Sequence, residues 1–343
     1  MNPVPPKPHA VLIVCLRYLG DTLLLRPALR ALRAAHPDAR LDAVVTAGTA
    51  CALEGCADVS QVIEWPRRNL LREAALAMTL ARRRYDWVID FTGNDRSALV
   101  ALASRAGFRV AYERPKLPAW SLRRAAYHFR PHHKKSKPHA VIQRLELLEA
   151  CGVPSQGTDF ELLPAADSLA AARLALEGLP SKVFHAHVTS RDMQKALPAS
   201  VVKTVLAAVI ERGCGVVITG GPDEAERRHV KLCTEGLPGE SFRIFHDLDW
   251  QGLVATIALC DRYWGADTAP AHIAAAFKKK MLIHYGPSRA DHWHPLHPDG
   301  RADSLPCECL RNKRVSCPPG EPGKCLQGLR AADVLAWLEE NRD

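Results

Sequence analysis

Short apolar runs, each leading into a polar turn and then a helical pattern, recur along this chain of 343 residues. The first run, residues 10–16, contains no polar side chain, which is typical of a strand buried on both faces of a sheet. Further strands are expected at 41–46, 62–65, 87–91, 183–188, 215–219, 242–245, 260–264 and 280–285. Helical patterns lie between them at 23–36, 71–84, 139–151, 198–211 and 253–259. Strands that alternate with helices predict parallel, doubly wound α/β sheets, which bind ligands at the carboxyl ends of their strands.

The alternation breaks over residues 152–164 and then restarts, so we interpret this stretch as a linker. It predicts an N-terminal domain over residues 1–160 and a C-terminal domain over 161–343, both Rossmann-like and facing a cleft. A last helix at about 329–342 is expected to pack back on the N-terminal domain.

The composition is that of a globular protein, with 47% hydrophobic and 24% charged residues. Its apolar runs are too short to span a bilayer, and no signal-peptide pattern is visible. Eleven scattered cysteines then indicate reduced thiols, and we expect a cytoplasmic protein. The formal net charge of +9 favours an acidic partner, which could be nucleic acid, an anionic membrane surface or a phosphorylated substrate.

One turn in the second half of the chain predicts a phosphate-binding site. A strand leads into Gly265, Asp267 or Thr268 can N-cap the following helix, and Pro270 suits its first turn. Such a helix terminus offers free N–H groups and the positive end of the helix dipole to a phosphate. His272 lies within the same first turn. The alternative is an ordinary capped helix with a surface histidine.

Three charged residues, Asp21, Asp95 and Arg96, and the turn residue Gly20 also lie at the ends of predicted strands in the first half. From residue 109 to 138 the pattern gives way to a basic segment with interleaved aromatic residues. Its members are Arg114, Lys116, Arg123, Arg124, Arg130, His132, His133, Lys134, Lys135 and Lys137, with Trp120, Tyr127 and Phe129 among them. A solvated loop explains such a run as well as a docking surface for an anionic acceptor does.

In combination, these motifs resemble the bacterial ADP-heptose:lipopolysaccharide heptosyltransferases of glycosyltransferase family 9. The resemblance spans nearly the whole chain and is carried, in family order, by residues 16–29, 187–190 with Lys195, 220–224 and 265–272. Asp95 and Arg96, in a Thr-Gly-x-Asp-Arg context, are most similar to the type III subgroup, which acts on the core-branch heptose.

The resemblance implies a two-domain GT-B fold that binds the acceptor in its N-terminal domain and the sugar nucleotide in its C-terminal domain. It also implies an inverting, metal-independent transfer of heptose from ADP-heptose to the lipopolysaccharide inner core, with no cofactor. Asp21 matches the catalytic aspartate, the base that deprotonates the acceptor hydroxyl as it attacks the anomeric carbon. The alternative for Asp21 is a helix N-cap.

The donor-binding residues that the resemblance implies are Thr189, Ser190, Lys195, Glu224, Leu248, Asp267, Thr268, Ala269 and His272. The lysine, the two hydroxyls and the helix start would neutralise the leaving ADP without a metal. Glu224 would bind a ribose hydroxyl, with Glu226 as a rival, and Leu248 would lie beside the adenine.

The implied acceptor-binding residues are Arg17, Asp95, Arg96, Lys116 and His139. The implied partners are the lipopolysaccharide core acceptor, the nucleotide sugar and the anionic inner face of the inner membrane, where the enzyme would lie peripherally as a monomer. No nucleic-acid partner is expected.

Two departures from the family pattern touch the donor pocket and leave open another sugar nucleotide or another acceptor glycan. The aromatic residues that usually flank the lysine are missing around Lys195, and Ala269 stands where many relatives have glycine or serine. Near the end of the chain stand four cysteines, Cys307, Cys309, Cys317 and Cys325. Their spacing lacks the Cys-x₂-Cys pairs typical of zinc sites, so loop thiols are expected, with a structural metal as the alternative.

Three other classes of protein are alternatives for this sequence. A basic nucleic-acid-binding protein would account for the charge, but no helix-turn-helix, RRM or zinc-finger pattern is present. A dinucleotide oxidoreductase would need Gly-x-Gly-x-x-Gly after the first strand, and the chain lacks it. A catalytically inactive relative would keep the same motifs, and only a measurement of transfer separates it from an enzyme.

Overall fold

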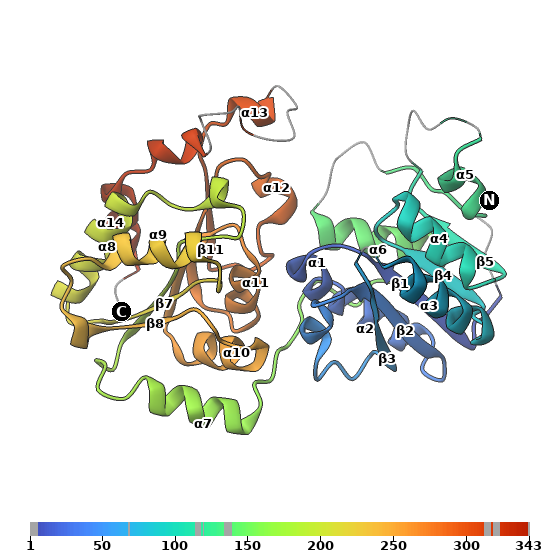
Figure 1. Cartoon of the computed structure of the whole chain (residues 1–343), viewed down its shortest axis with the longest axis horizontal. Coiled ribbons are helices and arrows are strands. Elements are labelled where there is room, and N and C mark those ends of the chain that lie inside the picture. The colour runs from blue at the N-terminus through green and yellow to red at the C-terminus, as the bar shows by residue number, and fades with distance from the viewer. Residues whose placement is uncertain are drawn as a thin grey trace. The chain divides into compact units, whose positions relative to one another are not determined.

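The computed structural model describes residues 6–67, 69–113, 118, 120–133, 139–311, 317 and 323–341. Its contacts divide the chain into two compact units, Met1–Phe160 and Glu161–Asp343 (Figure 1). Each unit is built on its own parallel sheet, which confirms the fold class expected from the alternation of strands and helices.

The first sheet has five strands in the order β3-β2-β1-β4-β5. They are β1 (Ala10–Cys15), β2 (Arg40–Thr46), β3 (Gln61–Trp65), β4 (Trp87–Asp90) and β5 (Phe108–Ala111). All six residues of β1 are buried, as its uninterrupted apolar run predicts for a central strand. The strand order reverses beside β1, so the switch point lies between the carboxyl ends of β1 and β4.

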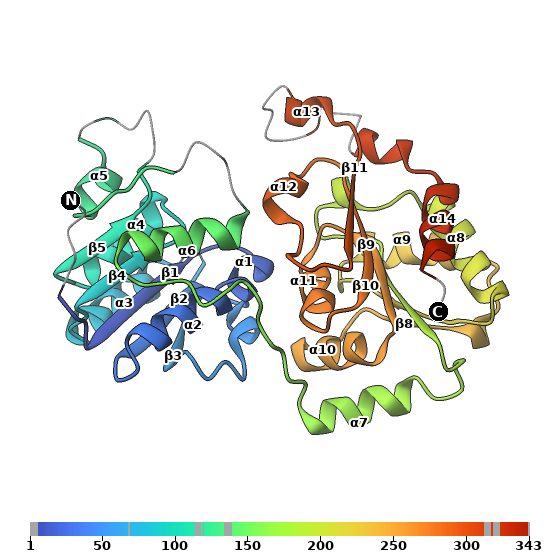
Figure 2. The same ribbon diagram turned by 180° about the vertical axis from the view of Figure 1, so that it is seen from behind.

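Helices cover both faces of this sheet (Figures 1 and 2). They are α1 (Leu19–Leu23), α2 (Arg26–Ala35), α3 (Leu70–Arg82), α4 (Asp95–Ala103), α5 (Leu122–Ala126) and α6 (Ala140–Ala150), with a 3₁₀ turn, η1 (Ala50–Leu53), after β2. Helix α2 packs beside α6 on one face, and α3 packs beside α4 on the other.

Two elements of the first unit differ from the expectation. The helix expected over 23–36 is α2, which begins later, at Arg26, one residue before Pro27, whose missing N–H is tolerated in a first turn. A separate short helix, α1, precedes it and was not expected. Strand β5 lies where the basic segment was expected to begin. Arg109 fits within this strand because its guanidinium donates to the main-chain oxygens of Ala106 and Ala126, each at 2.6 Å.

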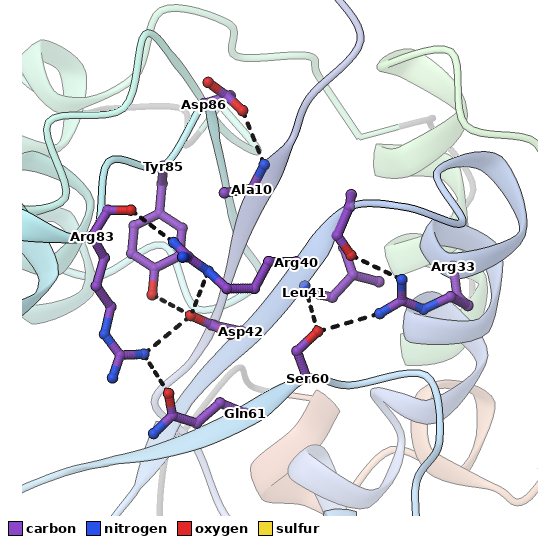
Figure 3. Close-up of polar contacts among 11 residues, drawn as sticks. Ala10, Arg33, Arg40, Leu41, Asp42, Ser60, Gln61, Arg83, Tyr85 and Asp86 are labelled. Carbon is purple, nitrogen blue, oxygen red and sulfur yellow. Dashed lines mark hydrogen bonds and ion pairs between the residues drawn. The ribbon is translucent and has the colours of Figure 1, made fainter.

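A network of buried charge joins the amino ends of β2 and β3 to the segment before β4 (Figure 3). Asp42 is fully buried, and its Oδ2 accepts hydrogen bonds from the hydroxyl of Tyr85 at 2.6 Å and from Arg83 at 3.1 Å. Arg40 pairs with the same oxygen at 3.3 Å. Burial and the bond to Asp42 raise the pKa of Tyr85, so the phenol keeps its proton and donates. The two arginines at this edge therefore share one buried carboxylate.

The second sheet has six strands in the order β11-β10-β9-β6-β7-β8. They are β6 (Val183–His187), β7 (Gly215–Thr219), β8 (Phe242–Phe245), β9 (Arg262–Ala266), β10 (Lys280–Tyr285) and β11 (Gly300–Ser304). The order reverses between β6 and β9, which places the switch point of this sheet there. Strand β11 was not expected, because this half-exposed edge strand carries none of the apolar run that marks the others.

The helices of the second unit are α7 (Ala166–Ala175), α8 (Ala199–Glu211), α9 (Glu224–Thr234), α10 (Trp250–Leu259), α11 (Ala269–Ala276), α12 (Ala290–Trp293), α13 (Glu308–Arg311) and α14 (Ala331–Glu340). Three 3₁₀ turns accompany them, η2 (Met193–Lys195), η3 (Gly239–Ser241) and η4 (Lys324–Gly328). The last helix, expected to pack back on the N-terminal domain, instead buries Val334, Trp337 and Leu338 in the core of the second unit. Their spacing of three and four residues places them on one face of α14.

Candidate active site

Two polar loops meet at the switch point of the second sheet. The loop after β6 carries Thr189, which is buried, and Ser190, and it continues into η2, whose last residue is Lys195. The loop after β9 carries Asp267 and Thr268 and leads into α11. Parallel sheets bind ligands at such points because neighbouring loops turn away from each other and leave a crevice.

An ion pair joins these two loops. The Nζ of Lys195 lies 2.9 Å from the Oδ2 of Asp267 and 3.4 Å from its main-chain oxygen. The lysine side chain keeps 28% of its surface exposed, whereas that of Asp267 keeps 10%. The pair therefore holds a positive charge in a fixed place and leaves it open to an anion from solvent.

The close approach of β6 and β9 depends on a glycine. A Cβ atom on Gly265 would lie 2.4 Å from the main-chain oxygen of His187 and 3.1 Å from the hydroxyl of Tyr263. Real Cβ atoms do not come that close to backbone, so only glycine allows this strand spacing. The spacing in turn keeps the two polar loops within reach of each other.

The start of α11 is not capped by a side chain. Thr268 occupies the N-cap position, but its hydroxyl donates to the main-chain oxygen of Ala266 at 3.4 Å and accepts no N–H. Asp267 is engaged by the lysine, so the prediction that one of these two side chains caps the helix is wrong. The N–H groups that begin at Ala269, together with the helix dipole, favour an anion here. His272 lies buried in the same turn.

Two glutamates at the start of α9 have different environments. Glu226 is buried, and its Oε2 accepts a hydrogen bond from the N–H of Gly221 at 3.0 Å, which fixes the turn after β7. Glu224 is exposed over 85% of its side chain and pairs with Arg228 at 2.5 Å. The carboxylate of Glu224 is therefore open to solvent, whereas that of Glu226 is not. Leu248, after β8, is half-buried at the same edge of the sheet.

Two buried histidines below this site were given no role by the sequence analysis. The Nδ1 of His187 lies 2.9 Å from the hydroxyl oxygen of Thr219, and the Nε2 of His185 lies 3.0 Å from the same atom. Burial lowers the pKa of His185 to about 3 and the pKa of His187 to about 4, so both rings are neutral at pH 7. The two histidines stand two residues apart in β6 and so lie on the same face of the sheet. This spacing is visible in the sequence and could have indicated that they act together.

In the first unit, Asp21 lies in α1 with 8% of its surface exposed. Arg144 of α6 donates to the main-chain oxygen of Asp21 at 2.8 Å and to its Oδ1 at 3.3 Å. The same guanidinium lies 5.9 Å from the centre of the Phe91 ring. The N-cap position of α1 belongs to Tyr18, so the alternative of Asp21 as a helix cap is wrong.

Sequence reasoning missed Arg144. The signal was an arginine flanked by apolar residues in the helix expected over 139–151. A buried guanidinium needs a partner for its charge, so such a residue predicts a carboxylate nearby.

Two of the expected acceptor-binding residues lie at the carboxyl edge of the first sheet. Arg17 follows β1 and donates to the main-chain oxygen of Thr92 at 3.4 Å. Asp95 begins α4, where 68% of its side chain is exposed, and pairs with Arg123 at 2.8 Å. Both keep polar atoms near solvent, as an acceptor ligand would require.

The other expected acceptor residues have structural partners or lie outside the described residues. Arg96 pairs with Glu73 at 2.7 Å and also bonds a main-chain oxygen of the loop before α3. His139 is buried and N-caps α6, where its Nδ1 accepts the N–H of Val141 at 3.2 Å. Lys116 falls outside the described residues.

Acidic side chains organise the described part of the basic segment. Arg124 and Arg130 both contact Glu113, each at 3.4 Å. The ring of His133 stacks on that of Tyr112 with 3.7 Å between centres. The other cations, Arg114, Lys116, Lys134, Lys135 and Lys137, lie outside the described residues, so their docking role stays a prediction.

The four late cysteines are free thiols. The N–H of Cys317 donates to the side-chain oxygen of Gln194 at 3.0 Å, so this segment contacts the turn that carries the lysine of the ion pair. Within the described ranges, no group of three or more histidine, cysteine, aspartate or glutamate side chains is arranged to hold a metal ion.

Comparison with known proteins places these features in a family. Residues 73–321 match the family model described as glycosyltransferase family 9 (heptosyltransferase). Lipopolysaccharide heptosyltransferase 3 of Escherichia coli K12 is 26% identical, and the alignment covers 95% of this chain and 96% of that protein.

Solved structures share the architecture. A family 9 glycosyltransferase from Veillonella parvula superposes with a TM-score of 0.81 at 18% identity and covers 99% of this chain and 98% of its own. The Escherichia coli heptosyltransferase WaaC, solved with ADP-2-deoxy-2-fluoro heptose, gives a TM-score of 0.72 at 25% identity and covers 97% of this chain and all of its own. In the part of the chain that the structure describes, no helix has the length and apolar character needed to cross a bilayer.

Proposed function

This chain belongs to glycosyltransferase family 9, the heptosyltransferases, and we propose that it transfers a heptose from ADP-heptose to the core of lipopolysaccharide. The observation that carries the proposal is the ion pair between Lys195 and Asp267 beside the uncapped start of α11. A cation and a helix N-terminus at one switch point suit the diphosphate of a sugar nucleotide. The relative solved with an ADP-heptose analogue supports this choice of donor.

Asp21 acts as the general base of the reaction. It takes the proton of the acceptor hydroxyl while that oxygen attacks the anomeric carbon and the bond to the diphosphate breaks. Attack opposite the leaving group inverts the anomeric centre. Arg144 holds Oδ1, which leaves Oδ2 of Asp21 to accept the proton. The buried arginine thus orients the base and does not itself react.

Charge on the leaving ADP is neutralised by the protein. Lys195 and the first N–H groups of α11 face the phosphates, and the hydroxyl of Ser190 adds a donor. The hydroxyl of Thr189, also expected to bind the donor, is fully buried and donates to the Sδ of Met193. Fixed donors of this kind stabilise developing negative charge without reorganisation, so transfer proceeds without a divalent metal. Asp267 holds the lysine in place. His272 is buried in the first turn of α11, beside the N–H groups that face the phosphates.

The rest of the donor lies along the same edge of the second sheet. The exposed carboxylate of Glu224 accepts a ribose hydroxyl, and Leu248 provides an apolar contact for the adenine. Because the aromatic residues that usually flank the lysine are missing, a different sugar on the same nucleotide is the alternative donor.

The acceptor binds the first unit through Arg17 and Asp95. Arg96 and His139 support this surface from beneath through their structural contacts. Lys116 adds a further cation. The acceptor is anchored in the inner membrane, so the enzyme works as a cytoplasmic monomer held peripherally at the anionic inner face. Lysine and arginine near such a surface each contribute about 1 kcal/mol to binding.

A donor panel tests the proposal. Purified protein is mixed with ADP-heptose, ADP-glucose or UDP-glucose, and thermal stability and release of nucleotide in the presence of heptose-containing core oligosaccharide are both measured. ADP-heptose at 100 times its Kd should add about 2.7 kcal/mol to stability and alone support transfer. Stronger stabilisation and faster transfer with another sugar nucleotide would replace ADP-heptose as the donor. Stabilisation by ADP-heptose without transfer would indicate an inactive relative.

A further inference from the structure

Helix α3 presents apolar side chains to solvent on the face where a surface helix normally carries polar ones. Of its thirteen residues, all of them described, only Leu80 is buried, and the half-buried Leu76 and Ala77 pack with it on the core of the first unit. At about 100° per residue, Leu71 and Met78 lie opposite Leu80. These two residues are 86% and 54% exposed. The outward face of α3 is therefore apolar.

Three more apolar residues widen this outward face. Leu70, Ala74 and Ala75 are also exposed, and together with Leu71 and Met78 they form what we call the α3 stripe. Leu70 alone keeps 82% of its surface open to solvent. Single exposed leucines are common on protein surfaces, but a row of apolar side chains along one helix marks an interaction surface.

Exposed arginines stand at both ends of the α3 stripe. Arg67 and Arg72 lie near the start of the helix, and Arg82 and Arg84 lie near its end. No side chain among the described residues pairs with any of these four guanidinium groups. The only acidic residue of α3, Glu73, already has an arginine partner on α4 at 2.7 Å. The stripe is therefore flanked by positive charges that are open to an anionic partner.

The size of the stripe indicates what kind of surface it can bind. A helix of thirteen residues is about 20 Å long and about 10 Å wide, so one face presents about 200 Å². A stable interface between two proteins buries about 800 Å² on each partner, which the stripe alone cannot supply. An apolar row with flanking arginines is instead typical of helices that lie in the surface of an anionic membrane.

The stripe begins beside residues that are expected to bind the acceptor. Helix α3 follows β3, so its first turn lies at the carboxyl edge of the first sheet, where α4 also begins. The two helices lie side by side on one face of that sheet (Figures 1 and 2), and Arg96 of α4 bonds Glu73 of α3. A lipid-linked acceptor could therefore reach the first unit from the surface that the stripe contacts.

We propose that the α3 stripe inserts into the surface of an anionic lipid bilayer, with Leu71 and Met78 among the upper parts of the acyl chains and Arg72 and Arg82 at the phosphates. The inference deepens the proposed function and rests on it for the lipid-linked acceptor. Binding to the bilayer itself requires neither donor nor acceptor. The helix would hold the first unit, with its acceptor residues, at the membrane.

Sedimentation with vesicles tests the proposal on the full-length protein without substrates. The probe vesicles contain equal parts of phosphatidylcholine and phosphatidylglycerol, and the comparison vesicles contain phosphatidylcholine alone. Leu71→Ser/Met78→Ser should bind the anionic vesicles at least about tenfold more weakly, because two side chains no longer gain an apolar environment. Arg72→Gln/Arg82→Gln should also lose about tenfold on the anionic vesicles and nothing on the neutral ones.

A matched control removes exposed leucines elsewhere. Leu163→Ser/Leu174→Ser changes two residues of the second unit that are 81% and 68% exposed, and its affinity should stay within about twofold of that of the unmodified protein. Equal losses in this control and in the stripe variant would show that overall surface hydrophobicity accounts for the binding. That result, or an unchanged affinity of the stripe variant, would overturn the proposal.

Hydrogen exchange locates the contact on the molecule. Anionic vesicles should slow the exchange of amides in residues 70–82 and leave the exchange of α7 unchanged. Protection of α7 without protection of α3 would contradict the assignment. A dimer in solution that dissociates in Leu71→Ser/Met78→Ser would replace the bilayer by a second copy of the chain and would also overturn it.

Two further measurements separate the bilayer contact from folding and from transfer. The unfolding midpoint of the stripe variant should match that of the unmodified protein, because both side chains are exposed. Should the double variant fail to fold, Leu71→Ser alone should still lose about threefold or more in vesicle affinity, and no loss would count against the proposal.

Transfer to a water-soluble core oligosaccharide should be unchanged in the stripe variant, whereas transfer to an acceptor embedded in anionic vesicles should fall at least about tenfold. An equal fall with both acceptors would overturn the role of the stripe in membrane contact. No transfer by the unmodified protein to either acceptor would refute the proposed function, and the vesicle affinities would still decide the inference.

Discussion

Arg144 reaches from α6 to Asp21 in α1 and binds both its main-chain oxygen, at 2.8 Å, and its carboxylate, at 3.3 Å. Both side chains are nearly buried, with 7% and 10% of their surfaces exposed. The contact fixes the carboxylate and its backbone together, so the orientation of the proposed base is set by a helix more than 100 residues away in sequence.

Replacement of the proposed base should remove transfer and spare the nucleotide site. Asp21→Asn keeps the shape of the side chain but cannot take a proton, so kcat should fall about 10²- to 10⁴-fold. The Kd for ADP, measured by calorimetry, should not change. Asp38→Asn, a matched change at an exposed position, should leave kcat intact. Near-normal turnover in Asp21→Asn would exclude this residue as the base.

Arg144 should affect the stability of the protein through its contact with Asp21. Arg144→Met leaves a buried carboxylate without its partner and should destabilise the protein by about 3–5 kcal/mol in urea unfolding. The double variant Asp21→Asn/Arg144→Met should recover part of that loss, because no charge then remains buried. If the loss of stability in the double variant equalled the sum of the losses in the two single variants, the two residues would not be energetically coupled.

The lysine of the proposed donor site should act on the diphosphate. Lys195→Ala removes a charge-assisted contact and should weaken ADP about 10- to 100-fold. Lys203→Ala, on the exposed face of α8, should have no effect on ADP. EDTA should leave transfer by the unmodified protein unchanged, and a strict need for a divalent cation would contradict a role of the lysine in place of a metal.

Substitutions of the two glutamates of α9 should have different effects, one on ligand binding and the other on the stability of the fold. Glu224→Gln should weaken ADP-heptose without changing the unfolding midpoint, because its side chain is exposed. Glu226→Gln should lower the midpoint, because it weakens the bond that holds the N–H of Gly221. About 1–3 kcal/mol is expected for such a buried contact. The opposite pattern would assign the ribose to Glu226.

The buried histidines should make stability depend on pH. Their pKa values in the folded state, about 3 for His185 and about 4 for His187, lie below the ordinary value of 6.5, so the unfolded chain binds protons that the folded chain does not. The contribution is fully present above pH 6.5 and is lost as the pH falls towards 4, by about 1.4 kcal/mol per pH unit for each ring.

His187→Asn keeps a polar atom near Thr219 but removes one of these titrations. The slope of the unfolding free energy against pH, measured between pH 6 and pH 5, should therefore decrease by about 1.4 kcal/mol per pH unit, which corresponds to one proton. Equal slopes in the two proteins would mean that His187 takes up its proton in the folded state.

The sequence was informative wherever burial alone decides the structure. The apolar runs located β1, β6 and β7 to within a residue or two, because a strand covered on both faces admits few polar side chains. Two of the four edge strands, β5 and β11, escaped this rule. Arg109 in β5 and Asp303 in β11 face solvent or find partners, so no apolar run marks those elements.

Contacts between distant residues could not be read from the sequence. Asp21 was predicted as a site residue from its position after a strand, but its arginine partner depends on how α6 packs. Thr268 has the right chemistry for a helix cap, yet its hydroxyl bonds backward to Ala266. Competition between local and tertiary hydrogen bonds decides such cases, and only the folded chain resolves it.

Gly265 limits how this enzyme can diverge. The loops after β6 and β9 lie outside the sheet, so substitutions there can reshape the pocket for a different nucleotide or sugar. At residue 265 even one methyl group would collide with the main chain of His187 and force the strands that carry both loops apart. New donor preferences can therefore arise around this position, while the position itself has no neutral alternative to glycine.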